Sequence, residues 1–296
     1  MHILIAVDGS NGSREALRTV AATPFAAATR VTLLHVITRY VPAESAMARR
    51  TLDTLRADED RRAAQVIEEA RAIVAPRGFD LDVRRVEGHP AQQIVDNAAA
   101  LGVDLIVMGA LGVTGWMRVL LGSISLTVVK HAPCPVWVVK RPLKGGAPDV
   151  LVASDGSANA RHAIQALCAL PFPPETVCHL LHVIPAANDQ LHLGMGEPVP
   201  PVLDTLYRVG EAQRHHGERL LKEDAAALAG RFAEVRPFLL EGDARRRILD
   251  AAREVSADLI VLGSKGMSGV REFFLGSTSH KVLKHAEASV LIVPHP

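Results

Sequence analysis

The sequence predicts an α/β protein made of two tandem domains, each a doubly wound, mainly parallel five-stranded sheet with helices on both faces, as in Rossmann-like folds. Three observations carry this prediction. The chain of 296 residues has the length of two ordinary domains. Short motifs of its first half return in its second half. Within each half, short apolar runs alternate with longer segments of helical period, which is typical of a parallel sheet covered by helices.

The internal repeat is visible in three pairs of segments. The segments of the first copy are Asp8–Ser10, Leu33–Ile37 and Asp104–Gly109, and their counterparts are Asp155–Ser157, Leu180–Ile184 and Asp258–Gly263. The offset grows from 147 to 154 residues along the chain, so the second copy holds seven additional residues. We place them in Pro185–Pro201, whose Pro, Gly and Asn residues predict an extended loop. Pro and Gly residues between Lys140 and Asp149 mark the boundary, which gives domains over residues 1–141 and 148–296.

The elements of the first copy follow from its hydrophobic pattern. In chain order, the apolar runs predict strands at Ile3–Val7, Val31–Val36, Leu81–Val86, Leu105–Met108 and Val136–Val139. The periodic segments between them predict helices at Gly12–Ala22, Ala57–Ala75, Ala91–Leu101 and Ile124–Lys130. Because aromatic residues are scarce, we expect cores of Val, Leu, Ile and Ala. In such a sheet, a ligand binds beyond the carboxyl ends of the strands, where the strand order reverses.

The composition excludes several classes of partner. Lys plus Arg number 33 against 32 for Asp plus Glu, so no net field favours nucleic acid or an anionic membrane. The three cysteines form no C-x-x-C pair, and their odd number argues against a disulfide framework. The first residues read as a strand and lack a secretory pattern, and the apolar runs are far shorter than the roughly 20 residues that span a bilayer. We therefore expect a soluble, cytoplasmic protein.

Each copy carries a glycine motif after its fourth strand, in the form G-x-x-G, nine residues and then G-S. The motif residues are Gly109, Gly112, Gly122 and Ser123 in the first copy and Gly263, Gly266, Gly276 and Ser277 in the second. A glycine at a strand end lets the backbone approach a ribose or phosphate, and a helix that opens at Gly-Ser offers N–H groups to a phosphate. Alternatively, the glycines only make turns and the serines only cap helices. The loops between the glycines differ while the glycine positions agree, which favours a ligand.

Two further residue types recur at matching places. Asp8 and Asp155 follow the first strand of each copy, where a carboxylate could accept hydrogen bonds from ribose hydroxyls. The alternative is an Asp-Gly turn in which each Asp bonds its own backbone. His35 and His182 recur near the end of the second strand, where a partly buried, hydrogen-bonded histidine is favoured over a metal ligand, because neither has a ligand partner on its own face.

These residues resemble the universal stress proteins in their tandem form. The resemblance covers nearly the whole chain, and the family's signature of G-x-x-G, nine residues and G-[S/T] occurs twice. Ala132–Val139 also resembles the family's usual last strand, whereas its counterpart Ala286–Val293 lacks the Cys-Pro pair.

The resemblance implies an adenine nucleotide, typically ATP, with or without Mg²⁺. It implies that Asp8 and Asp155 bind the ribose, that the backbone of Val36 and Val183 contacts the adenine, and that the motif glycines and serines bind ribose and phosphates. It also implies that the last strands of the two copies pair, so that the domains form a pseudo-two-fold unit. Association of two chains and the identity of a protein partner stay open.

Three functions compete at this point. The leading hypothesis is an ATP-binding regulatory protein of the stress response, in which the nucleotide is a ligand or conformational switch; no Walker A pattern occurs, and no catalytic or metal-binding residue is assigned. The second is a slow ATP hydrolase or autophosphorylating enzyme that uses residues near the phosphate loops, namely Arg118, Ser123, Ser125, Ser277 and Ser279. The third is a scaffold with vestigial or unequal sites, since Lys265 stands in the second glycine turn where the first has Leu111.

Overall fold

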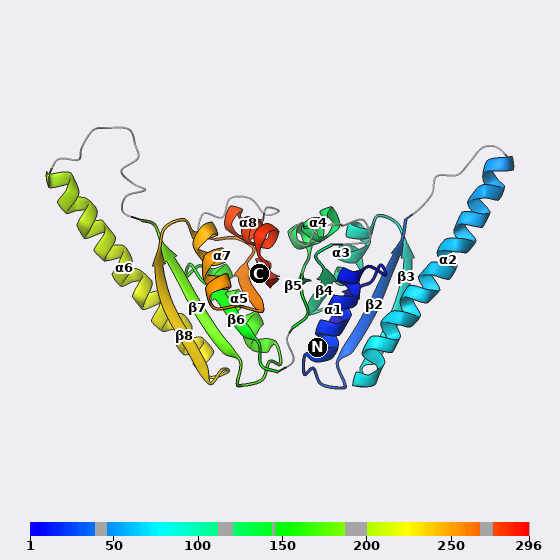
Figure 1. Cartoon of the computed structure of the whole chain (residues 1–296), viewed down its shortest axis with the longest axis horizontal. Coiled ribbons are helices and arrows are strands. Elements are labelled where there is room, and N and C mark those ends of the chain that lie inside the picture. Colours follow the sequence, from blue (N-terminus) through cyan, green and yellow to red (C-terminus); the bar gives the residue numbers. More distant parts are fainter. Residues whose placement is uncertain (39–45, 112–120, 144–145, 187–199, 267–274, 296) are drawn as a thin grey trace. The chain divides into compact units, whose positions relative to one another are not determined.

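The computed structural model describes residues 1–38, 46–111, 121–143, 146–186, 200–266 and 275–295. The chain divides into two compact units, Met1–Leu143 and Lys144–Pro296. Figure 1 shows that each unit combines a sheet with flanking helices.

The first unit contains five parallel strands in the order β3-β2-β1-β4-β5. Its strands are β1 (His2–Ala6), β2 (Arg30–Ile37), β3 (Asp80–Glu87), β4 (Leu105–Gly109) and β5 (Val136–Val139). Its helices are α1 (Asn11–Ala22), α2 (Ala46–Val74), α3 (Pro90–Leu101) and α4 (Ser123–His131), with a 3-10 turn at Ala75–Arg77. Helix α1 packs beside α2, and α3 packs beside α4. The strand order reverses between β1 and β4.

The second unit repeats this arrangement, with parallel strands in the order β8-β7-β6-β9-β10. Its strands are β6 (Asp149–Ala153), β7 (Val177–Ile184), β8 (Glu234–Glu241), β9 (Leu259–Gly263) and β10 (Ser289–Val293). Its helices are α5 (Ala158–Ala169), α6 (Pro200–Ala229), α7 (Ala244–Glu254) and α8 (Ser277–His285). Here the order reverses between β6 and β9. The predicted fold class, two doubly wound five-stranded sheets, is confirmed.

Two predicted boundaries are wrong. Helix α2 begins at Ala46, eleven residues before the predicted start at Ala57. The added segment contains neither Gly nor Pro and is rich in Ala, Arg and Leu, which favour helix. Helix α6 begins at Pro200, so the end of the predicted loop Pro185–Pro201 is helical, because proline is tolerated in the first turn, where its missing N–H is not needed. Residues 187–199 of that loop lie outside the described residues.

The cores consist mainly of Val, Leu, Ile and Ala, as predicted. Strands β1 and β4 are almost completely buried, with Ile3, Leu4 and Ile106 at 0% exposure. Cys134 and Cys178 belong to these cores, and burial raises the pKa of each thiol to about 12. Among the described helices, none combines the length and the apolar character that a membrane crossing requires.

Candidate nucleotide-binding sites

The predicted site residues gather at the carboxyl ends of the strands in each unit. Asp8 follows β1 and Gly109 ends β4, and these two strands are neighbours on either side of the reversal in strand order. Asp155 and Gly263 hold the same places after β6 and at the end of β9. In doubly wound sheets, this is the place where ligands bind.

Both aspartates form the tight turn that was the alternative to a ribose contact. The Oδ1 atom of Asp8 accepts a hydrogen bond from the N–H of Ser10 at 3.0 Å, and Oδ1 of Asp155 accepts one from Ser157 at 3.0 Å. Gly266 lies against the other oxygen, since a Cβ atom placed on it would be 2.6 Å from Oδ2 of Asp155. The turn fixes the direction of each carboxylate, and a ribose contact through Oδ2 stays a prediction.

The strand-end glycines have a packing role that the sequence argument did not foresee. A Cβ atom on Gly109 would lie 2.4 Å from the carbonyl carbon of Gly12 in α1. A Cβ atom on Gly263 would lie 3.0 Å from Asn159 in α5. Glycine is therefore needed at position 109 and favoured at position 263, so that the first helix of each unit can approach the strand end. Contact of these glycines with a ligand stays a prediction.

Ser123 and Ser277 are the first residues of α4 and α8, and they are exposed. The N-cap positions are Gly122 and Gly276, and no side-chain hydrogen bond caps either helix. The interpretation of the two serines as N-caps is therefore wrong. A helix whose first N–H groups are not capped by a side chain presents donors and a positive dipole end, which suit an anionic group.

Two other serines of the candidate set are buried structural residues. Ser125 is 3% exposed and donates a hydrogen bond to the carbonyl oxygen of Gly109 at 3.0 Å. Ser279 is 5% exposed and donates to the carbonyl oxygen of Gly263 at 2.7 Å. These hydroxyls hold the loop after the fourth strand and do not face solvent. Two further predicted residues, Gly112 and Arg118, lie outside the described residues.

The recurring histidines link two strand ends. Nδ1 of His35 donates to the carbonyl oxygen of Val7 at 2.8 Å, and Nδ1 of His182 donates to that of Ser154 at 2.7 Å. Each acceptor residue directly precedes the predicted ribose carboxylate. The two histidines are thus hydrogen-bonded, as the sequence favours. Within the described ranges, no cluster of His, Cys, Asp and Glu could hold a metal ion.

Val36 and Val183 lie one residue before the ends of β2 and β7, and both are half-buried. Each pairs with the adjacent edge strand, Val36 with Val86 and Val183 with Leu240. They therefore lie at the same carboxyl edge of the sheet as the aspartates. Contact of their backbone with an adenine stays a prediction.

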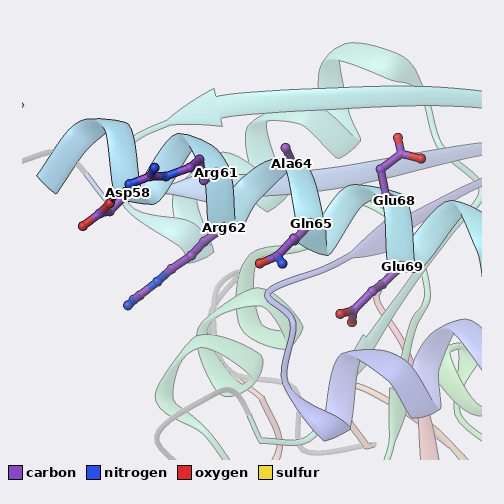
Figure 2. A pocket seen from close by; sticks show the side chains of 7 residues that line it. All are labelled: Asp58, Arg61, Arg62, Ala64, Gln65, Glu68 and Glu69. Carbon is purple, nitrogen blue, oxygen red and sulfur yellow. Dashed lines mark hydrogen bonds and ion pairs between the residues drawn. The ribbon is translucent and has the colours of Figure 1, made fainter. Parts of the chain in front are cut away.

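A shallow, open depression of about 840 Å³ lies along α2 in the first unit, and all of its lining residues belong to that one helix. Its lining residues are Asp58, Arg61, Arg62, Ala64, Gln65, Glu68 and Glu69. Figure 2 shows Arg62, Gln65 and Glu69 on one side of the helix and Ala64 and Glu68 on the other.

This stretch of α2 packs against the Asp8 turn. A Cβ atom on Gly9 would lie 2.7 Å from Cγ2 of Val66, and Nη2 of Arg14 lies 3.0 Å from Oε2 of Glu69. Arg62 and Gln65 are exposed neighbours of Val66 that sequence reasoning missed. Helix α2 carries no motif, so only the fold brings these residues near the site.

Sequence reasoning also missed three polar residues of the second unit. Oγ of Ser154 donates to Oδ2 of Asp224 in α6 at 2.5 Å and accepts from the N–H of Gly156 at 3.2 Å. Nδ2 of Asn159 donates to the carbonyl oxygen of Lys265 at 3.3 Å. A position-by-position comparison of the two copies could have found these three residues, because the first copy has Val7, Gly12 and Ala70 at the matching positions.

The model of the universal stress protein family matches residues 1–140 and again residues 148–294. The chain belongs to the universal stress protein family. Since the family model matches twice, this is the tandem form that the sequence suggested.

Relatives of the same family support the tandem organisation. A universal stress protein of Mycolicibacterium smegmatis is 27% identical over 309 aligned positions, which cover 98% of this chain and 96% of that protein. Universal stress protein MJ0531 of Methanocaldococcus jannaschii is 41% identical over 80 residues, which span 27% of this chain and about half, 47%, of that relative. The crystal structure of a universal stress protein from Archaeoglobus fulgidus has a TM-score of 0.66 at 21% identity and covers 100% of this chain and 98% of its own, which shows a common fold.

Proposed function

We propose that this universal stress protein binds ATP in both units and acts as a regulatory protein of the stress response, with the nucleotide as ligand or conformational switch. One observation carries the proposal. In each unit, a helix without a side-chain cap begins at a Gly-Ser pair on the sheet edge where the strand order reverses. Such a helix end suits the phosphates of a nucleotide.

The remaining residues fit the other parts of ATP. Asp8 and Asp155, oriented by their turns, would accept hydrogen bonds from ribose hydroxyls. The backbone of Val36 and Val183 at the same sheet edge would bind the adenine edge. Mg²⁺, where present, would arrive with the phosphates. Pairing of the last strands of the two copies, as the family resemblance implies, and action in the cytoplasm belong to the same proposal.

The test should spare the packing of the fold. Because Gly109 and Gly263 contact the first helix of their units, substitution of these glycines would test folding rather than binding. Ser123→Asp and Ser277→Asp are better, because both positions are exposed at a helix start. An aspartate there favours the helix dipole but repels a phosphate. Ser123→Asn and Ser277→Asn are the neutral controls of similar size.

Binding of ATP to the full chain is measured by calorimetry, together with the nucleotide that co-purifies. We expect the parent chain and the Asn controls to bind, each single Asp variant to lose one site, and the double Asp variant to lose ATP binding. Binding of ATP to the double Asp variant with unchanged affinity would refute the placement of the phosphates. No binding of any adenine nucleotide to the parent chain at millimolar concentration would refute the proposed function.

A further inference from the structure

The two candidate sites are built differently beneath their aspartate turns. In the second unit, Ser154 and Asp224 are 6% and 5% exposed and share a hydrogen bond of 2.5 Å. Ser154 also accepts the N–H of Gly156 at 3.2 Å, within the turn that carries Asp155. The turn is thus fastened to α6 through two hydrogen bonds, of which one is buried and the other partly buried.

The first unit has no such chain at the matching positions. Val7 takes the place of Ser154 and Ala70 the place of Asp224, and they are 3% and 1% exposed. The Asp8 turn contacts its long helix through Gly9 and Val66, as the Asp155 turn does through Gly156 and Leu220, so the hydrogen bonds of the second unit are an addition to a shared apolar contact. Apolar packing is non-directional, whereas a buried hydrogen bond fixes both position and direction. The turn that carries Asp155 therefore has a directional anchor that the Asp8 turn lacks.

The glycine turns differ as well. Asn159 is 5% exposed, and its side chain lies between α5 and the loop, where Nδ2 donates to the carbonyl oxygen of Lys265 at 3.3 Å. In the first unit the matching residues are Gly12 and Leu111, and the Leu111 carbonyl oxygen lies 2.3 Å from the position that a Cβ atom of Gly12 would take. The loop of the first unit thus rests directly on α1, and its Leu111 carbonyl oxygen accepts a hydrogen bond from Oγ of Ser10 at 3.4 Å. The loop of the second unit is held instead by the inserted side chain of Asn159.

Asn159 carries a cost that packing alone does not explain. Its Oδ1 atom is buried and has no hydrogen-bond partner among the described residues. Buried polar atoms without partners are rare in proteins because they lose their hydration without compensation. Gly12, the matching residue of the first unit, shows that the same fold forms without this side-chain amide. The loop that Asn159 holds also carries Lys265, a half-buried cation where the first unit has Leu111.

We propose that the second unit contains the preorganised, tighter ATP site and that Asp224 and Asn159 are its positioning residues. Asp224 acts through Ser154 on the Asp155 turn, and Asn159 acts on the Lys265 loop. The inference rests on the proposed function, because it ranks two sites of that function. A preorganised site pays less ordering entropy when the ligand binds, so it binds more tightly with the same contacts.

The two sites are compared in the full chain by closing one at a time. Ser123→Asp leaves the second site and Ser277→Asp leaves the first, and Mg²⁺-ATP is titrated into each by calorimetry. We expect the second site to bind ATP at least roughly tenfold more tightly than the first, the scale expected of a preorganised site. Affinities that agree within about twofold, with clear binding in both variants, would overturn this ranking; the proposed function would stand. Absence of binding in both would refute the proposed function itself.

The positioning residues are tested by importing the residues of the first unit. Ser154→Val with Asp224→Ala, and separately Asn159→Gly, are made in the Ser123→Asp chain. We expect each change to weaken ATP binding about tenfold. The same changes in the Ser277→Asp chain should leave the first site unaltered.

Asp224→Asn keeps an oxygen that accepts the Ser154 hydroxyl, so we expect it to restore most of the affinity. A purely structural role would instead lower the thermal midpoint of the variants and leave the affinity of the folded protein unchanged. That result would overturn the assignment of Asp224 and Asn159. Loss of binding with Asp224→Asn, in a chain that keeps Ser154, equal to that of the Ser154→Val, Asp224→Ala double variant would overturn the route through Ser154.

Discussion

Gly109 ends β4 at the place where the repeat pattern suggested a ligand contact. The structure gives this glycine a separate role, because α1 approaches the strand end so closely that Gly12 fills the position of a Cβ atom. The same holds more loosely for Gly263, where the nearest atoms belong to Asn159 at 3.0 Å. A repeated glycine can thus follow from helix packing as well as from binding, and only the fold separates the two.

A stability comparison tests this packing role. Gly109→Ala forces a backbone contact of 2.4 Å to relax, whereas Gly263→Ala starts from 3.0 Å. We expect Gly109→Ala to lower the free energy of unfolding by about 1–3 kcal/mol, as overpacking does, and Gly263→Ala to lower it less. Gly210→Ala in α6 is the control, because nothing lies within 4 Å of its Cβ position; alanine there should stabilise the helix by about 0.5–1 kcal/mol. Urea unfolding measures all three, and a Gly109→Ala protein as stable as its parent would contradict the packing role.

His2 gives the first unit a dependence on pH. Its Nε2 atom lies 2.8 Å from Oγ1 of Thr32 in the buried start of the sheet. Burial lowers the pKa of His2 below 6.5, the positive charge of Arg30 acts in the same direction, and Asp104 and Asp82 oppose it. The unfolded chain therefore binds a proton first as the pH falls.

His2 contributes fully to the free energy of unfolding above the pKa that it has in the unfolded chain. As the pH falls from that value toward the lower pKa of the folded chain, the unfolded chain takes up the proton first, and this stability is lost. We expect the parent chain to lose more stability between about pH 7.5 and about pH 5.5 than His2→Gln, whose amide does not titrate in this range. Urea unfolding across this range measures the difference. The exposed His215→Gln is the control and should follow the parent. Identical pH profiles of His2→Gln and the parent would contradict this account.

At the scale of elements, the helix starts fall into two groups. Helices α1 and α5 begin with capped turns, in which Ser10 accepts the N–H of Ser13 and Ser157 accepts that of Ala160, both at 3.1 Å. Helices α3, α4 and α8 begin without a side-chain cap, and of these three α4 and α8 begin at glycine. The caps of α1 and α5 satisfy backbone donors within the fold, whereas the first turns of α4 and α8 hold the donors that the proposed function assigns to phosphates.

Removal of a cap should therefore affect stability alone. We expect Ser157→Ala to lower the free energy of unfolding by about 1 kcal/mol, whereas Ser157→Asp, which keeps an acceptor, should stay close to the parent. Hydrogen exchange of the α5 amides locates the effect. Equal exchange in Ser157→Ala and Ser157→Asp would show that the cap does not hold this helix.

At the scale of the whole molecule, the repeat made the fold predictable. Buried strands such as β1 and β4 appear as continuous apolar runs, so their predicted bounds differ from the observed ones by one residue at most. The start of α2 could not be predicted, because its first turns lack the apolar periodicity of a buried face. The sequence placed Asp8 and the Gly-Ser pairs at the sheet edge, since topology brings strand ends together.

The contacts that distinguish the two sites could not be read in the same way. Ser154 and Asp224 are 70 residues apart, and Asn159 and Lys265 are 106 apart. Neither pair forms a local motif, and each contact depends on how closely a helix approaches a strand end. A difference between the copies at one position shows that a residue was replaced, and the structure shows which distant residue the replacement contacts.

Two units with their own cores should respond to ATP separately. A ligand that binds only the folded state stabilises it by about 2.7 kcal/mol at a hundred times its dissociation constant. We therefore expect ATP to slow hydrogen exchange in β4 and α4 of the first unit and in β9 and α8 of the second. Ser277→Asp should remove the protection of β9 and α8 and leave that of β4 and α4.

The response of the first unit to a substitution in the second decides how this result is understood. If Ser277→Asp also removes the protection of β4 and α4, ATP binding in the second unit controls the first, and the chain works as one switch. If ATP protects neither unit, the uncapped helices do not bind phosphate. Protection that is lost only in the unit carrying the substitution means that two sites report the nucleotide concentration independently, each over the range that its own affinity sets.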